Sequence, residues 1–257
     1  RELVRPYFDE VFLISGGGNS GSAPDVLTVD FSLRNPLSVL AVIRRIREQI
    51  VRFHPSVIHV HQAGTGAWLV LRAARGPGVP VVLTVWGSDI LLTPARGLLY
   101  REMLRYILRR ASFITADSMH LADAVRKLSG DYFRDILVTC LGIPDGLSPS
   151  PARENIVYSN RLHEKLYRIE WIVETFQRFL SGRKNEKWRL VIAGSGSRTD
   201  GLKALVRQKG LGESVLFTGW LNRDENMEYY RKARVFISFP ESDATSVSLL
   251  EAMQGGC

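Results

Sequence analysis

Short runs rich in β-branched residues alternate with longer stretches of helical periodicity along nearly the whole chain. In the first half, the predicted strands cover residues 10–15, 26–30, 56–61, 79–85, 111–118 and 136–140. The predicted helices cover residues 37–53, 67–75, 98–110 and a stretch that ends near 128. In the second half, predicted strands at 155–159, 189–193, 214–218 and 235–239 alternate with predicted helices at 169–180, 201–209 and 223–232. This alternation indicates parallel α/β layers, because parallel strands need crossover connections.

The two halves are separated by a segment rich in proline, glycine and serine, Gly-Ile-Pro-Asp-Gly-Leu-Ser-Pro-Ser-Pro at residues 142–151. Such a composition is typical of a linker. We therefore predict an N-terminal domain over residues 1–145, a linker over 146–154 and a C-terminal domain over 155–257.

Composition limits the classes of protein that fit. The 257 residues are 45% hydrophobic and 23% charged, which is globular. Two lone cysteines, Cys140 and Cys257, make neither a disulfide framework nor a zinc site, and no apolar run suits a bilayer span or a secretory signal, so we expect a cytoplasmic location. The formal net charge of +8 favours an anionic partner, namely a nucleotide, a nucleic acid or an acidic membrane. We expect no nucleic acid, because interleaved basic and aromatic patches are lacking.

The most informative stretch lies near the C-terminal end, where a predicted strand stops at Pro240 and a polar loop leads into a helix. The amides of Ala244, Thr245, Ser246 and Val247 are expected at the helix N-terminus, which favours a phosphate group. Glu251, about two turns further on, is expected to point back toward the loop. An alternative is that Ser248, Glu251 and Gln254 form only the solvated stripe of an amphipathic helix.

Asp243 and Glu251, separated by seven residues and followed by Ala-Met, resemble the donor-site signature of family 4 glycosyltransferases with the GT-B fold. That signature usually reads Glu, seven residues, Glu. The resemblance implies that Glu251 contacts the ribose of a nucleotide and that Asp243, a shorter carboxylate than the usual Glu, lies near the donor sugar.

Two further segments extend the resemblance in the second half. Residues 160–165, Asn-Arg-Leu-His-Glu-Lys, imply that Arg161 and Lys165 bind the donor diphosphate, whose negative charge grows as it departs. Lys165 is one residue closer to Arg161 than is usual, so Arg168 is an alternative second cation. The segment Phe-Thr-Gly-Trp-Leu resembles the loop that borders the nucleotide base, and its residues Gly219, Trp220 and Leu221 are expected there.

In the first half, Thr84-Val-Trp-Gly-Ser-Asp89 resembles the family's Thr-Val-His-Gly-Ser-Asp element on the acceptor side of the cleft. Trp86 replaces the histidine and cannot act as a base, so we expect it to form a wall. The resemblance places His61, Gly87, Ser88 and Asp89 in the same cleft, whereas His59 is interpreted as a hydrogen-bonded residue at the end of a strand.

Two other patterns are open to a functional interpretation. Gly16-x-Gly18-x-x-Gly21 matches a dinucleotide fingerprint in letters only, because a strand rather than a helix follows, so we interpret it as a mobile loop. The predicted helix 98–110 has Leu104 and Leu108 on its apolar side and carries four arginines, Arg101, Arg105, Arg109 and Arg110. They form either a solvated basic face or, for Arg101, Arg105 and Arg109, a contact with an anionic membrane.

Together these motifs predict a GT-B architecture, in which two Rossmann-like parallel-sheet domains face a cleft. Both domains are expected to be incomplete, with exposed sheet edges that favour aggregation, because a first strand and a strand after the last helix are missing from the pattern.

The predicted activity is transfer of a hexose, with retention, from a nucleotide sugar to a carbohydrate or lipid-linked acceptor hydroxyl in polysaccharide, lipopolysaccharide or glycolipid biosynthesis. Neither a cofactor nor a metal is expected, since there is no Asp-x-Asp motif. The alternatives are a sugar-nucleotide epimerase of the same fold and a non-catalytic module that binds a nucleotide sugar or RNA.

Overall fold

The computed structural model describes residues 5–17, 25–130, 135–140, 142–143, 152–183, 187–243 and 245–257. The chain divides into two compact units, Arg1–Cys140 and Leu141–Cys257. Of the predicted linker at 146–154, only residues 152–154 lie within the described ranges. Gly18 and Gly21 of the glycine pattern also lie outside them, so its interpretation as a mobile loop stays a prediction.

The first unit contains two parallel sheets. A two-stranded sheet pairs β1 (Leu13–Ser15) with β2 (Val26–Thr28). A four-stranded sheet has the order β3 (Ile58–His61), β4 (Val81–Thr84), β5 (Phe113–Ala116) and β6 (Ile136–Val138). The helical elements are η1 (Arg5–Tyr7), α1 (Pro36–Phe53), α2 (Thr65–Ala73), α3 (Ser88–Leu91), η2 (Thr93–Arg96), α4 (Leu98–Arg110) and α5 (Met119–Ser129). The prediction of parallel α/β layers is confirmed, while the short helix α3 was not expected.

Local signals explain where the longest helix begins and ends. Pro36 occupies its first position, one residue before the predicted start, and the side chain of Asn35 accepts a hydrogen bond from Leu37 N at 2.9 Å. The helix ends at His54, which has a left-handed backbone with a φ of 49°. One face is buried through Val42, Ile46 and Ile50, which are spaced by one helical turn.

The two faces of the four-stranded sheet differ in burial. Val60, Leu83 and Ile114 lie side by side in register and are buried. Their neighbours along the strands point to the opposite face and are half-buried or exposed, as at Thr84 and at Phe113, which is 62% exposed. Helices therefore cover one face of this sheet, and polar residues near its carboxyl edge remain accessible on the other.

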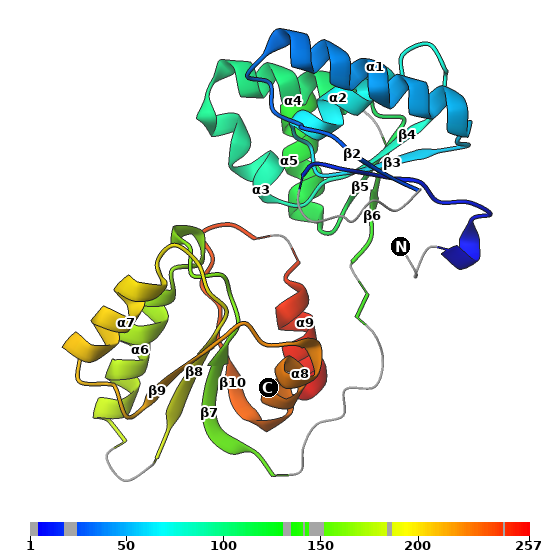
Figure 1. Cartoon of the computed structure of the whole chain (residues 1–257). Helices are drawn as coiled ribbons and strands as arrows, with labels where there is room; N and C mark the ends of the chain where they lie inside the picture. The colour runs from blue at the N-terminus through cyan, green and yellow to red at the C-terminus, as the bar shows by residue number, and fades with distance from the viewer. Residues whose placement is uncertain are drawn as a thin grey trace. The chain divides into compact units, whose positions relative to one another are not determined.

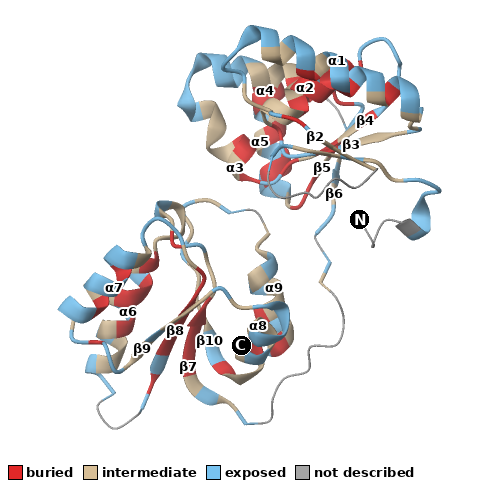
Figure 2. Ribbon diagram, in the orientation of Figure 1, coloured by how far each residue is buried: buried red, intermediate tan, exposed pale blue. Residues whose placement is uncertain are grey.

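The second unit contains a single parallel sheet with the order β10 (Ala233–Phe236), β7 (Glu154–Ser159), β8 (Arg189–Ala193) and β9 (Val215–Gly219). Figure 1 shows α6 (Ile169–Ser181) and α7 (Thr199–Gln208) on one side of it, and α8 (Arg223–Lys232) and α9 (Val247–Gly255) on the other. A short 3₁₀ helix, η3 (Lys165–Tyr167), precedes α6. The central strands are buried on both faces, as the red strands in Figure 2 show.

Strand β10 ends earlier than the sequence predicts, at Phe236 rather than Phe239. Ile237 N still donates to Tyr158 O at 2.9 Å, and the chain then leaves the ladder toward α9. Because β7 and β10 are parallel neighbours, the loops that follow them emerge at the same edge of the sheet. The candidate site lies at this carboxyl edge of the sheet.

Candidate functional site

Arg161 is the centre of the candidate site, and it lies two residues after the end of β7. Its side chain is only 10% exposed, and its guanidinium lies over the ring of Tyr167 at 4.5 Å. It donates to Ser246 Oγ at 2.6 Å and to Asp243 Oδ2 at 2.5 Å. Arg161 therefore meets two other predicted site residues, which follow it by more than 80 positions in the sequence, at the carboxyl edge of the sheet.

The N-terminus of α9 lies slightly later than the sequence predicts. The helix begins at Val247, with Ser246 as its N-cap, so the amides of residues 244–247 are not all in its first turn. Ala244 lies outside the described residues. The hydroxyl of Ser246 makes no side-chain capping bond and instead accepts from Arg161. The positive end of the helix dipole and the guanidinium therefore lie together, and both favour an anion.

Glu251 lies on the second turn of α9 and is half-buried rather than part of a fully solvated stripe. Its carboxylate hydrogen-bonds to the hydroxyl of Tyr230, a fully buried residue of α8. A carboxylate held in this way at the carboxyl edge has a fixed orientation. This fits the predicted contact with a ribose better than the solvated alternative.

The second predicted cation is not part of this arrangement. Lys165 is exposed on η3, and its side chain makes no hydrogen bond or ion pair with a described residue. The alternative, Arg168, stacks over Trp171 at 4.6 Å and pairs with Glu241 at 3.6 Å. Among the described residues, Arg161 is the cation that pairs with Asp243.

The predicted base loop follows β9. Gly219 has a φ of 73°, a conformation that suits glycine, and its carbonyl accepts from Gly194 N at 2.7 Å. Trp220 is 70% exposed, while Leu221 packs against the core between the sheet and α8. An exposed indole on an anchored loop suits stacking against a planar group.

The glycine-rich turn after β8 packs directly beneath the Arg161 loop. A Cβ atom at Gly194 would lie 2.9 Å from Arg161 O, and one at Gly196 would lie 2.7 Å from His163 O. The carboxylate of Glu164 also accepts from Ser197 N at 2.7 Å. This turn therefore has a structural role, because it supports the backbone that carries Arg161.

Several buried polar atoms at this edge have no hydrogen-bond partner among the described residues. They lie at the end of β7 or after β7 and β10 in the sequence, and they are Ser159 Oγ, Asn160 Oδ1, Ser238 Oγ and Ser242 Oγ. Buried polar atoms are normally paired, so such a cluster is typical of a place where a polar ligand or water binds.

In the first unit, the predicted acceptor residues follow β3 and β4. His59 donates to or accepts from Thr84 Oγ1 at 2.7 Å, which confirms its interpretation as a hydrogen-bonded residue. His61 makes no such bond to a described residue, and its ring meets that of Trp86 edge-on at 5.9 Å. Trp86 is 46% exposed, so the His61–Trp86 pair presents an aromatic surface, as expected for a wall.

For Asp89 the structure corrects the expectation of a residue facing a cleft. Asp89 is 3% exposed, and its carboxylate accepts from the amides of Ala63 at 2.7 Å and Trp86 at 3.1 Å. Burial raises the pKa of Asp89, and these backbone hydrogen bonds oppose that rise. Asp89 thus ties the loop after β3 to the loop after β4, which contains Gly87 and leads into α3 at Ser88.

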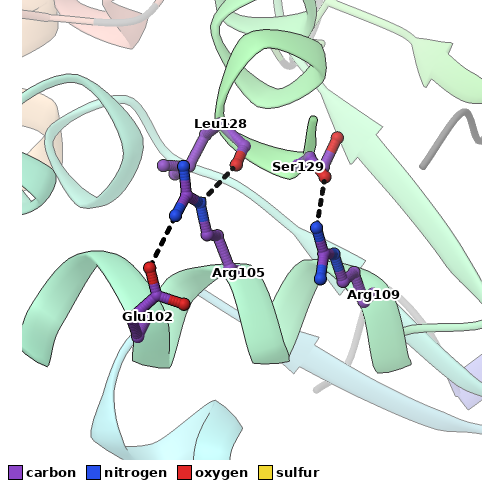
Figure 3. Close-up of polar contacts among 5 residues, drawn as sticks. All are labelled: Glu102, Arg105, Arg109, Leu128 and Ser129. Carbon is purple, nitrogen blue, oxygen red and sulfur yellow. Dashed lines mark hydrogen bonds and ion pairs between the residues drawn. The ribbon is translucent and has the colours of Figure 1, made fainter. Parts of the chain in front are cut away.

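The basic helix α4 also differs from expectation. Leu104 and Leu108 are buried, as predicted, but two of the three arginines proposed to face a membrane bind within the unit. Figure 3 shows Arg105 donating to Leu128 O at 3.3 Å and pairing with Glu102, while Arg109 donates to Ser129 O at 3.3 Å. They hold the carbonyl end of α5, where the helix dipole favours cations.

Sequence reasoning missed the buried and half-buried polar residues beneath Glu251, namely Tyr158, Asn160, Asn226 and Tyr230. They lie on β7, on the loop after it and on α8, so they form no local pattern in the sequence. Among the described residues, no group of three His, Cys, Asp or Glu side chains is arranged to hold a metal ion. No helix within the described ranges is long and apolar enough to cross a bilayer.

Two parallel-sheet units, one of which carries an arginine and two carboxylates at the carboxyl edge of its sheet, define a protein of the GT-B class. The family described as "Glycosyl transferase 4-like" matches residues 14–118, and "Glycosyl transferases group 1" matches residues 147–257. The chain therefore belongs to the family 4-like glycosyltransferases with the GT-B fold.

Similar proteins span a range of glycosyltransferases. The alpha-monoglucosyldiacylglycerol synthase of Streptococcus pneumoniae is 25% identical over 232 residues, which cover 80% of this chain and 51% of that protein. S. aureus TarM, solved with UDP, has a TM-score of 0.69 at 12% identity and is matched over 83% of this chain and 43% of its own. Anabaena HepE with UDP and glucose has a TM-score of 0.70 at 14% identity, and the match covers 96% of this chain and 78% of HepE. The chain spans about half the length of the first two.

Proposed function

We propose that this protein transfers a sugar from a nucleotide-sugar donor to an acceptor hydroxyl, with the donor bound in the second unit. The observation that carries this proposal is the contact of Arg161 with both Ser246 and Asp243 at the N-terminus of α9. A guanidinium and a helix N-terminus at one point suit a diphosphate, which becomes more negative as it leaves the sugar.

Each carboxylate has a separate proposed role. Glu251, oriented by Tyr230, binds the ribose hydroxyls, and Trp220 borders the base. Asp243 pairs with Arg161 when no donor is bound, and its carboxylate then orients the donor sugar once the diphosphate takes over the arginine. Ser246 provides a neutral polar contact to the same arginine.

The finer assignment rests on the similar proteins. A hexose donor, retention of configuration and a lipid or carbohydrate acceptor are supported by the name of the S. pneumoniae glucosyldiacylglycerol synthase and by the UDP and glucose bound to HepE. We propose that no metal takes part, since a guanidinium and helix amides supply positive charge to the diphosphate. Lys165 or Arg168 then acts as a second cation.

We further propose that the N-terminal turn of α4 meets an anionic membrane at the inner face. Leu98 and Leu99 are 72% and 86% exposed, next to the exposed Arg101, whereas Arg105 and Arg109 bind α5. Two exposed leucines beside a cation favour an interfacial position. Leu98→Ser with Leu99→Ser should abolish co-sedimentation with vesicles that contain anionic lipid, and unchanged sedimentation would exclude this surface.

The activity is tested by incubating the protein with UDP-, GDP- and ADP-hexoses, with and without a diacylglycerol or glucoside acceptor, in the presence of EDTA. Release of nucleoside diphosphate together with a new glycoside in the mass spectrum supports the proposal. An isomerised donor without any glycoside would instead show an epimerase. Absence of both binding and release for every donor would contradict the proposal.

A further inference from the structure

A hydrogen-bonded chain of buried and half-buried side chains runs beneath Glu251 and joins three elements of the second unit. It begins at the loop after β9, crosses α8 and the end of β7, and ends on α9. Its members are Tyr158, Asn160, Asn226 and Tyr230, and the rings of Tyr158 and Tyr230 are fully buried. The resemblance assigns no role to any of them.

The direction of each hydrogen bond follows from the chemistry of the groups. Asn226 Nδ2 donates to Leu221 O at 3.4 Å and Asn222 O at 3.3 Å, which fixes the amide orientation. Its Oδ1 therefore accepts, from Tyr158 at 2.5 Å and from Asn160 Nδ2 at 3.1 Å. The amide of Asn226 thus links the loop at Leu221 to the end of β7.

The second half of this hydrogen-bonded chain reaches the carboxylate of Glu251. Asn160 Nδ2 also donates to the hydroxyl of Tyr230 at 2.7 Å, and Ser248 hydrogen-bonds to the same hydroxyl. An ionised carboxylate can only accept, so the single proton of Tyr230 is donated to Glu251. Burial raises the pKa of Tyr230, and the charge of Glu251 raises it further, so this hydroxyl stays protonated.

We propose that Tyr230 is the positioning residue for Glu251, and that Asn160 and Asn226 tie its hydroxyl to the loop at Leu221. The inference rests on the proposed function, because it assumes that Glu251 binds the ribose. In this arrangement the loop that borders the base and the carboxylate that binds the ribose share one rigid hydrogen-bonded chain, so the nucleoside is recognised as a unit.

The test measures recognition of the ribose separately from recognition of the diphosphate. The unaltered protein is titrated in a calorimeter with uridine, guanosine and adenosine 5′-diphosphates, with their 2′-deoxy counterparts and with inorganic pyrophosphate. The variants are Tyr230→Phe, Glu251→Gln and, as the control, Tyr229→Phe. Tyr229 is adjacent on α8 and stacks on Tyr158 at 5.0 Å, but its hydroxyl bonds to no described residue.

We expect the unaltered protein and Tyr229→Phe to prefer the ribonucleotide by about tenfold or more, as for a hydrogen bond to a charged group. Tyr230→Phe should reduce this preference at least threefold, by the estimate of about 1 kcal/mol for one hydrogen bond, while the affinity for pyrophosphate is unchanged. In the double variant with Glu251→Gln, the two effects should not add.

A preference retained in full by Tyr230→Phe but lost in Glu251→Gln would overturn the positioning role alone. Failure of the unaltered protein to bind any of the three diphosphates would overturn the proposed function and this inference with it. If Tyr230→Phe does not fold, Asn160→Ala removes the amide that holds the same hydroxyl. It should likewise reduce the preference for the ribonucleotide and leave the affinity for pyrophosphate unchanged.

Discussion

At the scale of single residues, the arginine at the carboxyl edge of the second sheet has two competing anions. Asp243 pairs with Arg161 at 2.5 Å, with side-chain exposures of 28% and 10%. In the proposed function, a donor diphosphate has to displace Asp243 from this guanidinium. The negative charge of Asp243 therefore opposes the binding of a free nucleoside diphosphate, although the same carboxylate is proposed to help bind the sugar.

Asp243→Asn keeps the shape of the side chain and removes this charge. We expect a free nucleoside diphosphate to bind about 3- to 10-fold more tightly, while turnover with the nucleotide sugar falls. Ser246→Ala is the matched control, because it removes a neutral partner of Arg161 and changes no charge. Calorimetry and initial rates separate the two effects, and weaker diphosphate binding by Asp243→Asn would contradict the competition.

A second prediction at this scale concerns His163, which is 1% exposed and contacts Thr199 Oγ1 at 2.9 Å. Burial lowers the pKa of His163, so below about pH 6.5 the unfolded state binds more protons than the folded state. Its contribution to stability is complete above that pH and is lost as the pH falls toward the lowered pKa.

Urea unfolding at about pH 7.5 and about pH 5.5 checks this expectation. The loss of stability between these two values should be smaller in His163→Gln than in the unaltered protein. The exposed His120 on α5 provides the control, and His120→Gln should leave the loss unchanged. An equal loss in all three proteins would show that His163 is not the titrating group.

At the scale of elements, α4 buries leucines in the core and also holds the end of α5, and the sequence predicts only the first of these contacts. The periodicity predicts its bounds and its buried leucines, because both depend on local spacing. The partners of Arg105 and Arg109 depend on where α5 ends, about 20 residues later in the chain, and no local pattern reveals that contact.

Replacing Arg105 and Arg109 by glutamine should therefore destabilise the first unit. We expect a loss of about 1 to 2 kcal/mol in total, since each arginine holds a helix-end carbonyl and the side chain of Arg105 is partly exposed. Arg101→Gln, an exposed position on the same helix, should cost almost nothing. Thermal melts measure both, and equal stability of the double variant and Arg101→Gln would show that these contacts contribute nothing.

The same difference between local sequence patterns and contacts formed on packing applies to the candidate site. The resemblance to the family implies Arg161, Asp243 and Glu251, and the strand–loop–helix signals place the loops that carry Arg161 and Asp243 at the carboxyl ends of parallel strands. It misplaces β10 by three residues at its C-terminal end and misses Tyr230 and Asn226 entirely. Those two residues matter through contacts across α8, α9 and β7, and these contacts exist only after the elements have packed.

At the scale of the whole molecule, the residues proposed to bind the donor all lie in the second unit, and the residues proposed for the acceptor lie in the first. The aromatic pair of His61 and Trp86 follows one sheet, and the Arg161 cluster follows the other. This division between the two units is part of the proposed function. In that proposal, Arg161 is the group whose charge matters most as the diphosphate departs.

The most direct test compares Arg161→Ala with Arg189→Ala in single-turnover experiments with the nucleotide sugar. Arg189 pairs with Glu154 at 2.9 Å at the opposite, amino end of the same strands, so it is a matched control. We predict that Arg161→Ala lowers the rate of transfer about 100-fold or more and weakens donor binding less than about tenfold, because its charge matters most as the diphosphate departs. Arg189→Ala should change neither. Weakened donor binding with an intact rate of transfer would contradict the central role of Arg161.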